Sequence, residues 1–129
     1  MPAKPETRSN NVQLGLVGLK AVSRISAHWE LSERERIALT AIPDNIWQLA
    51  KCDEFSSSLN RDQLLRLSAI VGIYKALKLY FSEEISAQWV TLPNNGPLFC
   101  GARPIDIMIS DGLPAILSVR HYLDDLLYE

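Results

Sequence analysis

Residues 61–81 read RDQLLRLSAIVGIYKALKLYF and form the longest amphipathic segment of the chain. Their apolar side chains recur at steps of three and four residues, which is the spacing of one face of an α-helix. Asn60 directly precedes the segment, where its side chain is suited to cap the first turn. The sequence therefore predicts a long helix with one wide buried face. That face comprises Leu64, Leu67, Ile70, Val71, Tyr74, Leu77 and Phe81.

Shorter helices are predicted on both sides of this segment. Apolar residues from Val12 to Trp29 form another helical stripe, and Ser32 with Glu35 fits the capping-box pattern at the start of a third helix. Prolines and acidic residues mark the starts of others. The remaining predicted helices lie at about 43–51, 82–90, after Pro104 and after Pro114. No run of alternating β-branched residues occurs, so the predicted fold is all-α with about seven helices.

The length and composition are those of a single globular unit. A chain of 129 residues with 47% apolar and 22% charged residues can bury a core without metals or disulfides. We expect a flexible N-terminus over 1–11, a helix–turn–helix-like region over 12–58 and a second helical part over 59–129. The polar N-terminus does not resemble a signal peptide, and no apolar run approaches the roughly 20 residues of a membrane span. The expected location is the cytoplasm.

The sequence contains no pattern that predicts catalysis or metal binding. The two histidines, His28 and His121, lie in different predicted helices, and Cys52 and Cys100 show no paired spacing. Asp124 and Asp125 are adjacent in a helix, so their side chains diverge and cannot act as a paired acid and base. No glycine-rich nucleotide-binding loop occurs. We therefore expect a protein that is not an enzyme and carries no metal or cofactor.

Residues 32–51 read as a degenerate helix–turn–helix. In such a unit the second helix enters the major groove of DNA, and here Asn45, Gln48 and Lys51 are the candidate contacts. Asparagine and glutamine side chains suit adenine edges. The candidate recognition helix, however, carries one basic and one acidic residue, so few of its side chains can hold phosphates. The architecture is plausible, whereas strong DNA binding by the free chain is not expected.

Three motifs in the second half of the chain resemble a known family. They are W-x-x-x-P-N from Trp89 to Asn94, F-x-G-x-x-P from Phe99 to Pro104, and V-R-x-Y-L from Val119 to Leu123. Together with the long helix at 61–81, they resemble the antitoxins of the Xre/MbcA/ParS type in order and spacing. The resemblance covers roughly the C-terminal half, and the first half resembles the degenerate helix–turn–helix of that family only loosely.

The resemblance implies that the chain binds a partner protein. Family members neutralise a RES-domain toxin, which consumes NAD or transfers ADP-ribose from it, by placing their C-terminal segment at its NAD pocket. Homodimers or larger toxin–antitoxin assemblies are also implied, as is DNA binding mainly by the complex. Carried over to this sequence, the toxin-binding residues are Trp89, Pro93, Asn94, Phe99, Gly101, Pro104, Tyr122, Leu123, Tyr128 and Glu129.

The composition of the C-terminal part supports a protein partner, but other functions remain open. Residues 82–129 carry seven acidic and two basic side chains, which suits a basic partner surface and disfavours a phosphate backbone. Trp89 and Phe99 suit the core better than direct contact, while the apolar and aromatic tail suits a partner site or self-association. The rival hypotheses are a dimeric helix–turn–helix transcriptional regulator acting through residues 32–51 and a purely structural helical adaptor.

Overall fold

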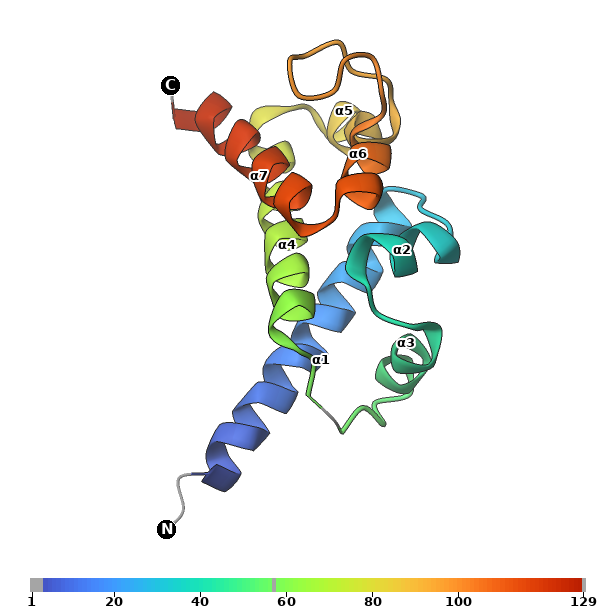
Figure 1. Ribbon diagram of the computed structural model, residues 1–129, viewed down its shortest axis with the longest axis vertical. Helices are drawn as coiled ribbons and strands as arrows, with labels where there is room; N and C mark the ends of the chain where they lie inside the picture. The colour runs from blue at the N-terminus through green and yellow to red at the C-terminus, as the bar shows by residue number, and fades with distance from the viewer. Residues whose placement is uncertain (1–3, 57, 129) are drawn as a thin grey trace.

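The structure is a computed structural model that describes residues 4–56 and 58–128. Over these residues all regular secondary structure is helical, which confirms the all-α prediction (Figure 1). Except at the start of α1, helix bounds lie close to those that the sequence predicts, and the connections are short except before α4 and α6. The elements are α1 (Lys4–His28), α2 (Glu33–Thr40), α3 (Asp44–Lys51), α4 (Arg61–Tyr80), α5 (Glu83–Gln88), the 3-10 turn η1 (Trp89–Thr91), α6 (Pro104–Asp111) and α7 (Leu113–Tyr128).

Helix α4 is the spine of the fold. It packs along α7 over one part of its length and crosses α1 over the other, so that it joins the N-terminal and C-terminal parts of the chain (Figure 1). Leu67, Ile70 and Leu77 of its predicted buried face are completely or almost completely buried. The other members of that face are partly buried, and Ile73, which the prediction did not include, is fully buried. The buried side chains form one continuous cluster that includes α1, α2, α3, α4, α6 and α7. The predicted boundary near residue 58 thus lies between two parts that share one core.

The largest difference from the sequence-based prediction concerns α1. Its helix begins at Lys4, not near Val12, and so takes in most of the segment that was expected to be a flexible N-terminus. A periodic apolar pattern reports which helical face is buried, and residues 4–11 carry no such pattern. Pro5 fits because proline is tolerated in the first turn of a helix. Residues 1–3 lie outside the described residues.

Residues 32–51 form two short helices connected by a three-residue turn. Ala41 ends α2 in the left-handed conformation at φ 58°, and Pro43 lies at the start of α3. The Trp47 indole donates to the Ile42 carbonyl at 3.1 Å, which fixes α3 against the turn. The connectivity is that of a helix–turn–helix, as the sequence predicts. None of the described helices is long and apolar enough to cross a membrane.

The capping box at α2 gives a testable contribution to stability. The Ser32 hydroxyl accepts from the Glu35 amide at 3.0 Å, and the Glu35 carboxylate accepts from the Ser32 amide at 2.9 Å. Ser32→Ala leaves an amide of the first turn unsatisfied, so we expect a loss of about 1 kcal/mol, or a fall of about 4 °C in Tm. Thermal unfolding measures it. Ser68→Ala, an exposed position within α4, is the control and should leave Tm almost unchanged.

Candidate partner-binding surface

The three sequence motifs meet at one aromatic side chain. Phe99 is 1% exposed and contacts Trp89 edge-to-face at 5.6 Å and Tyr122 edge-to-face at 5.8 Å between ring centroids. Trp89 in turn stacks near Phe81 at the end of α4, at 6.5 Å. A row of rings therefore connects α4, η1, the loop before α6 and α7. Edge-to-face pairs contribute about 0.5–1.5 kcal/mol each beyond the burial of their area, so this row fixes the C-terminal part of the fold.

The loop between η1 and α6 is closed by its own backbone. The Asn94 amide donates to the Ala102 carbonyl at 3.1 Å, and the Gly101 amide donates to the Asn94 carbonyl at 2.7 Å. The Asn94 side chain accepts from the Gly96 amide at 2.7 Å, which forms a local Asx turn. Gly101 has a φ of 91°, a conformation that only glycine adopts readily. Asn94 and Gly101 thereby tie the first motif to the second.

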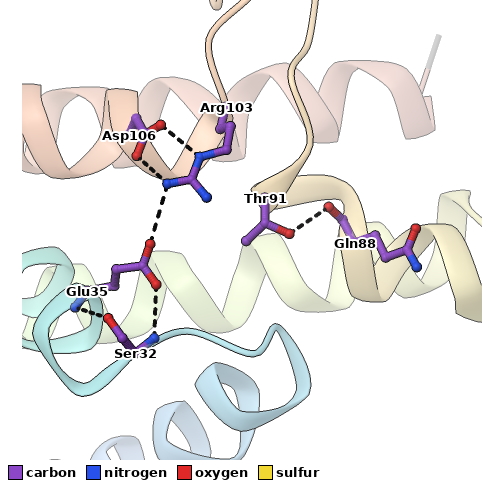
Figure 2. Close-up of polar contacts among 6 residues, drawn as sticks. All are labelled: Ser32, Glu35, Gln88, Thr91, Arg103 and Asp106. Carbon is purple, nitrogen blue, oxygen red and sulfur yellow. Dashed lines mark hydrogen bonds and ion pairs between the residues drawn. The ribbon is translucent and has the colours of Figure 1, made fainter.

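An ion pair attaches this loop to the helix–turn–helix part, as Figure 2 shows. The Arg103 guanidinium makes two 2.8 Å hydrogen bonds to the Asp106 carboxylate and lies 3.5 Å from Glu35 Oε2. Glu35 is the same side chain that closes the capping box of α2. Hydrogen bonding to Arg103 lowers the pKa of Asp106, and the same hydrogen bond raises the pKa of Arg103. One arginine thus links α2 to the start of α6.

The depressed pKa of Asp106 predicts a pH-dependent contribution to stability. A carboxyl whose pKa is lower in the folded than in the unfolded chain stabilises the fold above its ordinary pKa of 3.8 and loses that effect as the pH falls through the lowered pKa. Asp106→Asn should therefore cost about 0.2–1 kcal/mol near pH 6, since the pair is exposed to solvent. Urea unfolding across a pH series measures the difference in free energy of unfolding between the wild type and Asp106→Asn. This difference should disappear in acid, and a difference that stays constant with pH would contradict this account.

Two adjoining hollows lie along the outer face of α7. One of about 250 Å³ lies between α6, α7 and Leu98, and the other of about 440 Å³ continues toward the C-terminus. Leu98 and Ser118 line both, so the two form one groove, which we name the α7 groove. Leu98 and Leu117 are exposed within it. The α7 groove is lined by Leu98, Ile107, Asp111, Pro114, Ala115, Leu117, Ser118, Val119, His121, Tyr122 and Asp125.

The groove continues into an exposed row on α7. Leu117, His121, Asp125 and Tyr128 follow each other at steps of four, four and three, which places them on one helical face. All four are exposed, and Tyr128 is 82% exposed. His121 Nε2 lies 3.5 Å from the Asp125 carboxylate. The face opposite this row carries the buried residues Ile116, Val119 and Leu123.

The charge on α6 and α7 is mainly acidic. The two helices carry four aspartates, of which Asp106 pairs with Arg103 and Asp124 lies 3.9 Å from the Arg120 guanidinium. Asp111 and Asp125 belong to the α7 groove itself. An apolar groove with carboxylates at its edges can accept an apolar or aromatic side chain from a surface that is otherwise basic.

The structure divides the predicted toxin-binding residues into two groups. Trp89, Phe99, Pro104 and Leu123 are buried, so they shape the surface and are not exposed for contact. Pro93, Gly101 and Tyr128 are exposed, and Asn94 and Tyr122 are half-buried, with Tyr122 lining the α7 groove. Glu129 lies outside the described residues. On α3 the candidate DNA contacts Asn45, Gln48 and Lys51 are all exposed.

Sequence reasoning missed the groove residues that lie off the core stripe. The motifs do not include Leu98 or Leu117, and His121 enters the sequence analysis only as a histidine without a catalytic partner. A signal was present in Leu117, which is apolar yet stands outside the row formed by Ile116, Val119, Leu123 and Leu126. No local signal marks Leu98, because it enters the groove only through the folding of the loop before α6.

A related protein is found in Sinorhizobium fredii. The uncharacterized protein y4oB of Sinorhizobium fredii (strain NBRC 101917 / NGR234) is 36% identical to this chain over 107 residues, which span 82% of this chain and 81% of y4oB. No protein-family model matches the chain, and no solved structure matches it significantly.

Proposed function

The chain belongs to the same family as y4oB, and we propose that it is an antitoxin that binds and neutralises a RES-domain toxin. In this proposal the chain acts by occupying a surface on its partner, so it needs no catalytic residue, cofactor or metal of its own. The toxin consumes NAD or transfers ADP-ribose from it, and the complex forms in the cytoplasm. The resemblance of the three motifs to Xre/MbcA/ParS antitoxins supplies the identity of the partner.

The observation that carries the proposal is that the three motifs meet at Phe99, whose neighbour Tyr122 lines the α7 groove. Phe99 of the second motif contacts Trp89 of the first and Tyr122 of the third, and Tyr122 lines the groove. Trp89 and Phe99 are buried together, and Tyr122 connects them to the open apolar surface. Groove and exposed tail are continuous through Asp125 and Tyr128 on one face of α7.

Charge supports the choice of partner. Basic groups suit a pocket that holds the pyrophosphate of NAD, and an acidic helix end is complementary to such a pocket. Asp124 and Asp125 lie in the last turns of α7, within four residues of the exposed Tyr128. We propose that this end enters or covers the NAD pocket of the toxin, with Tyr128 as its aromatic anchor and the α7 groove receiving a side chain from the toxin surface.

Co-expression in bacteria tests the proposal. The neighbouring open reading frame is expressed alone and together with this chain, and cellular NAD and growth are measured. We expect the neighbour alone to lower NAD and arrest growth, and the chain to restore both. A neighbour that is harmless, or toxic but unaffected by this chain, contradicts the proposal. The proposed homodimer is tested separately by the mass of the purified chain in solution.

A dimeric transcriptional regulator is the second candidate, and the geometry of α3 favours it. Asn45, Gln48 and Lys51 are exposed along α3, the second helix of the helix–turn–helix. Gln48 Nε2 donates to Asp44 Oδ1 over 3.4 Å, which is long for a hydrogen bond. The Gln48 side chain can therefore turn toward a base edge at little cost. Gel shifts with operator-region DNA at low salt test this function, and it predicts affinity that falls as salt rises.

A further inference from the structure

A second hollow lies between α1, α2 and α3, on the part of the molecule that does not include the α7 groove. It has a volume of about 330 Å³, and we name it the basic hollow. Four cationic side chains line it from three helices: Lys20 and Arg24 of α1, Arg36 of α2 and Lys51 of α3. Glu33 is the single acidic residue of the lining. This surface is the reverse in charge of the acidic C-terminal part.

Two further carboxylates lie at its edge. Asp53 pairs with Lys20, and Asp44 Oδ1 lies 3.9 Å from Arg36 Nη2. Four cations therefore face three carboxylates, of which two are already engaged. Within the described part of the chain, Arg24 and Lys51 form no ion pair. These two side chains are the ones available to a ligand without breaking an existing contact.

Arg36 gives the hollow a fixed cation with unused hydrogen-bonding capacity. Its side chain is 17% exposed and its guanidinium lies over the Trp47 ring at 4.8 Å. The Trp47 ring is itself buried and held by its hydrogen bond to Ile42. Arg36 Nε is shielded from solvent and has no hydrogen-bond partner within the described residues. Buried donors are nearly always paired, so the unpaired Nε shows that the present position of this guanidinium does not use all of its donors, and a shift toward an anion in the hollow would let it use them.

We propose that the basic hollow binds a phosphate group through Arg24, Arg36 and Lys51. Arginine forks match the oxygens of phosphate in bidentate geometry, and cations that converge from three helices suit an anion with oxygens in several directions. A single carboxylate has only two oxygens and one charge, so it could pair fully with only one of these three cations. The phosphate belongs either to a small phosphorylated molecule or to the backbone of DNA, since Gln48 and Lys51 line the hollow and also lie on the exposed side of α3.

Calorimetric titration of the full chain at low salt tests the proposal with two probes. One is pyrophosphate and the other is duplex DNA of about 20 base pairs, each compared with sodium chloride at matched ionic strength. The test variant is Arg24→Ala with Lys51→Ala. The matched control is Arg61→Ala with Lys75→Ala, which removes the same charge from exposed positions on α4. Thermal unfolding of both double variants establishes that they are folded.

We expect saturable binding of pyrophosphate that weakens about tenfold or more in the Arg24/Lys51 variant and stays within about twofold in the control. Arg36→Lys, which keeps the charge and loses the fork, should also weaken it. Pyrophosphate binding without DNA binding assigns the site to a small molecule, whereas loss of both in the same variant assigns it to the DNA backbone. The proposal is overturned if neither probe shows saturable binding, or if the control variant loses as much affinity as the Arg24/Lys51 variant. Failure of this test would leave the antitoxin proposal standing, because the basic hollow and the α7 groove share no residue. We therefore expect the Arg24/Lys51 variant to neutralise the toxin as the wild type does.

Discussion

Removal of residues 125–129 is expected to abolish toxin neutralisation while leaving a folded chain. The truncation retains Ile116, Val119 and Leu123, which are the buried residues of α7. It removes the half-buried Leu126 and Leu127, so some stability is lost, and it removes Tyr128, which is 82% exposed. Aromatic anchors at interfaces contribute about 2–4 kcal/mol, and losing one of them weakens binding by roughly thirtyfold to a thousandfold.

Survival of bacteria that co-express the toxin with each variant measures this effect, and circular dichroism of the purified variants checks their folding. Tyr128→Ala alone should reproduce most of the loss without a change in Tm, because its side chain contributes little to the core. Leu117→Glu should also impair neutralisation, since it places a charge in the α7 groove. Leu14→Glu is the matched control, at a leucine that is 64% exposed on α1. Full protection by the truncated chain would exclude the tail as the inhibitory element.

Phe99→Ala is expected to be the most destabilising single substitution in the C-terminal part. Phe99 is 1% exposed and joins Trp89 to Tyr122, so its removal leaves a cavity and breaks two aromatic contacts. Truncation of a buried phenylalanine costs about 3–5 kcal/mol, which is a large share of the roughly 5–15 kcal/mol that stabilises a typical domain. Urea unfolding measures the cost.

Phe99→Leu is the control for this substitution. It keeps most of the volume but loses both edge-to-face contacts, so it should cost about 1–3 kcal/mol, less than Phe99→Ala. We also expect Phe99→Ala to reduce neutralisation, because the loop that carries Leu98 would no longer be fixed against α7. A free energy of unfolding that is nearly the same for Phe99→Ala and the wild type would show that the aromatic row does not hold the motifs together.

Most of the fold follows from local features of the sequence. Ser32 with Glu35 and Asn60 with Gln63 form capping boxes in the structure, so two helix starts were predictable from four residues. Pro104 marks the start of α6 differently, as a proline at the first helical position. The start of α1 was predicted wrongly because its first turns have no apolar stripe, and a periodic pattern detects only the part of a helix that packs on a core.

The binding surfaces were less predictable, because each depends on segments that meet only in the folded chain. The motif at Phe99–Pro104 does not indicate that Phe99 is buried while Leu98 beside it is exposed in a groove. The basic hollow unites Lys20 and Arg24 with Lys51, and sequence reasoning considered only the single cation of α3 for phosphate contact. Lys20 and Arg24 reach the hollow because α1 packs against α3, and no local pattern in the sequence predicts that packing.

The most direct test of the account is the rate of NAD consumption by the purified toxin at increasing concentrations of this chain. The account predicts inhibition that is complete once the chain saturates the toxin, and recovery of the rate when the chain lacks residues 125–129. An unchanged rate in the presence of excess full-length chain, at concentrations where the two proteins are shown to associate, would contradict occlusion of the NAD pocket. An absence of association would contradict the proposed partnership itself.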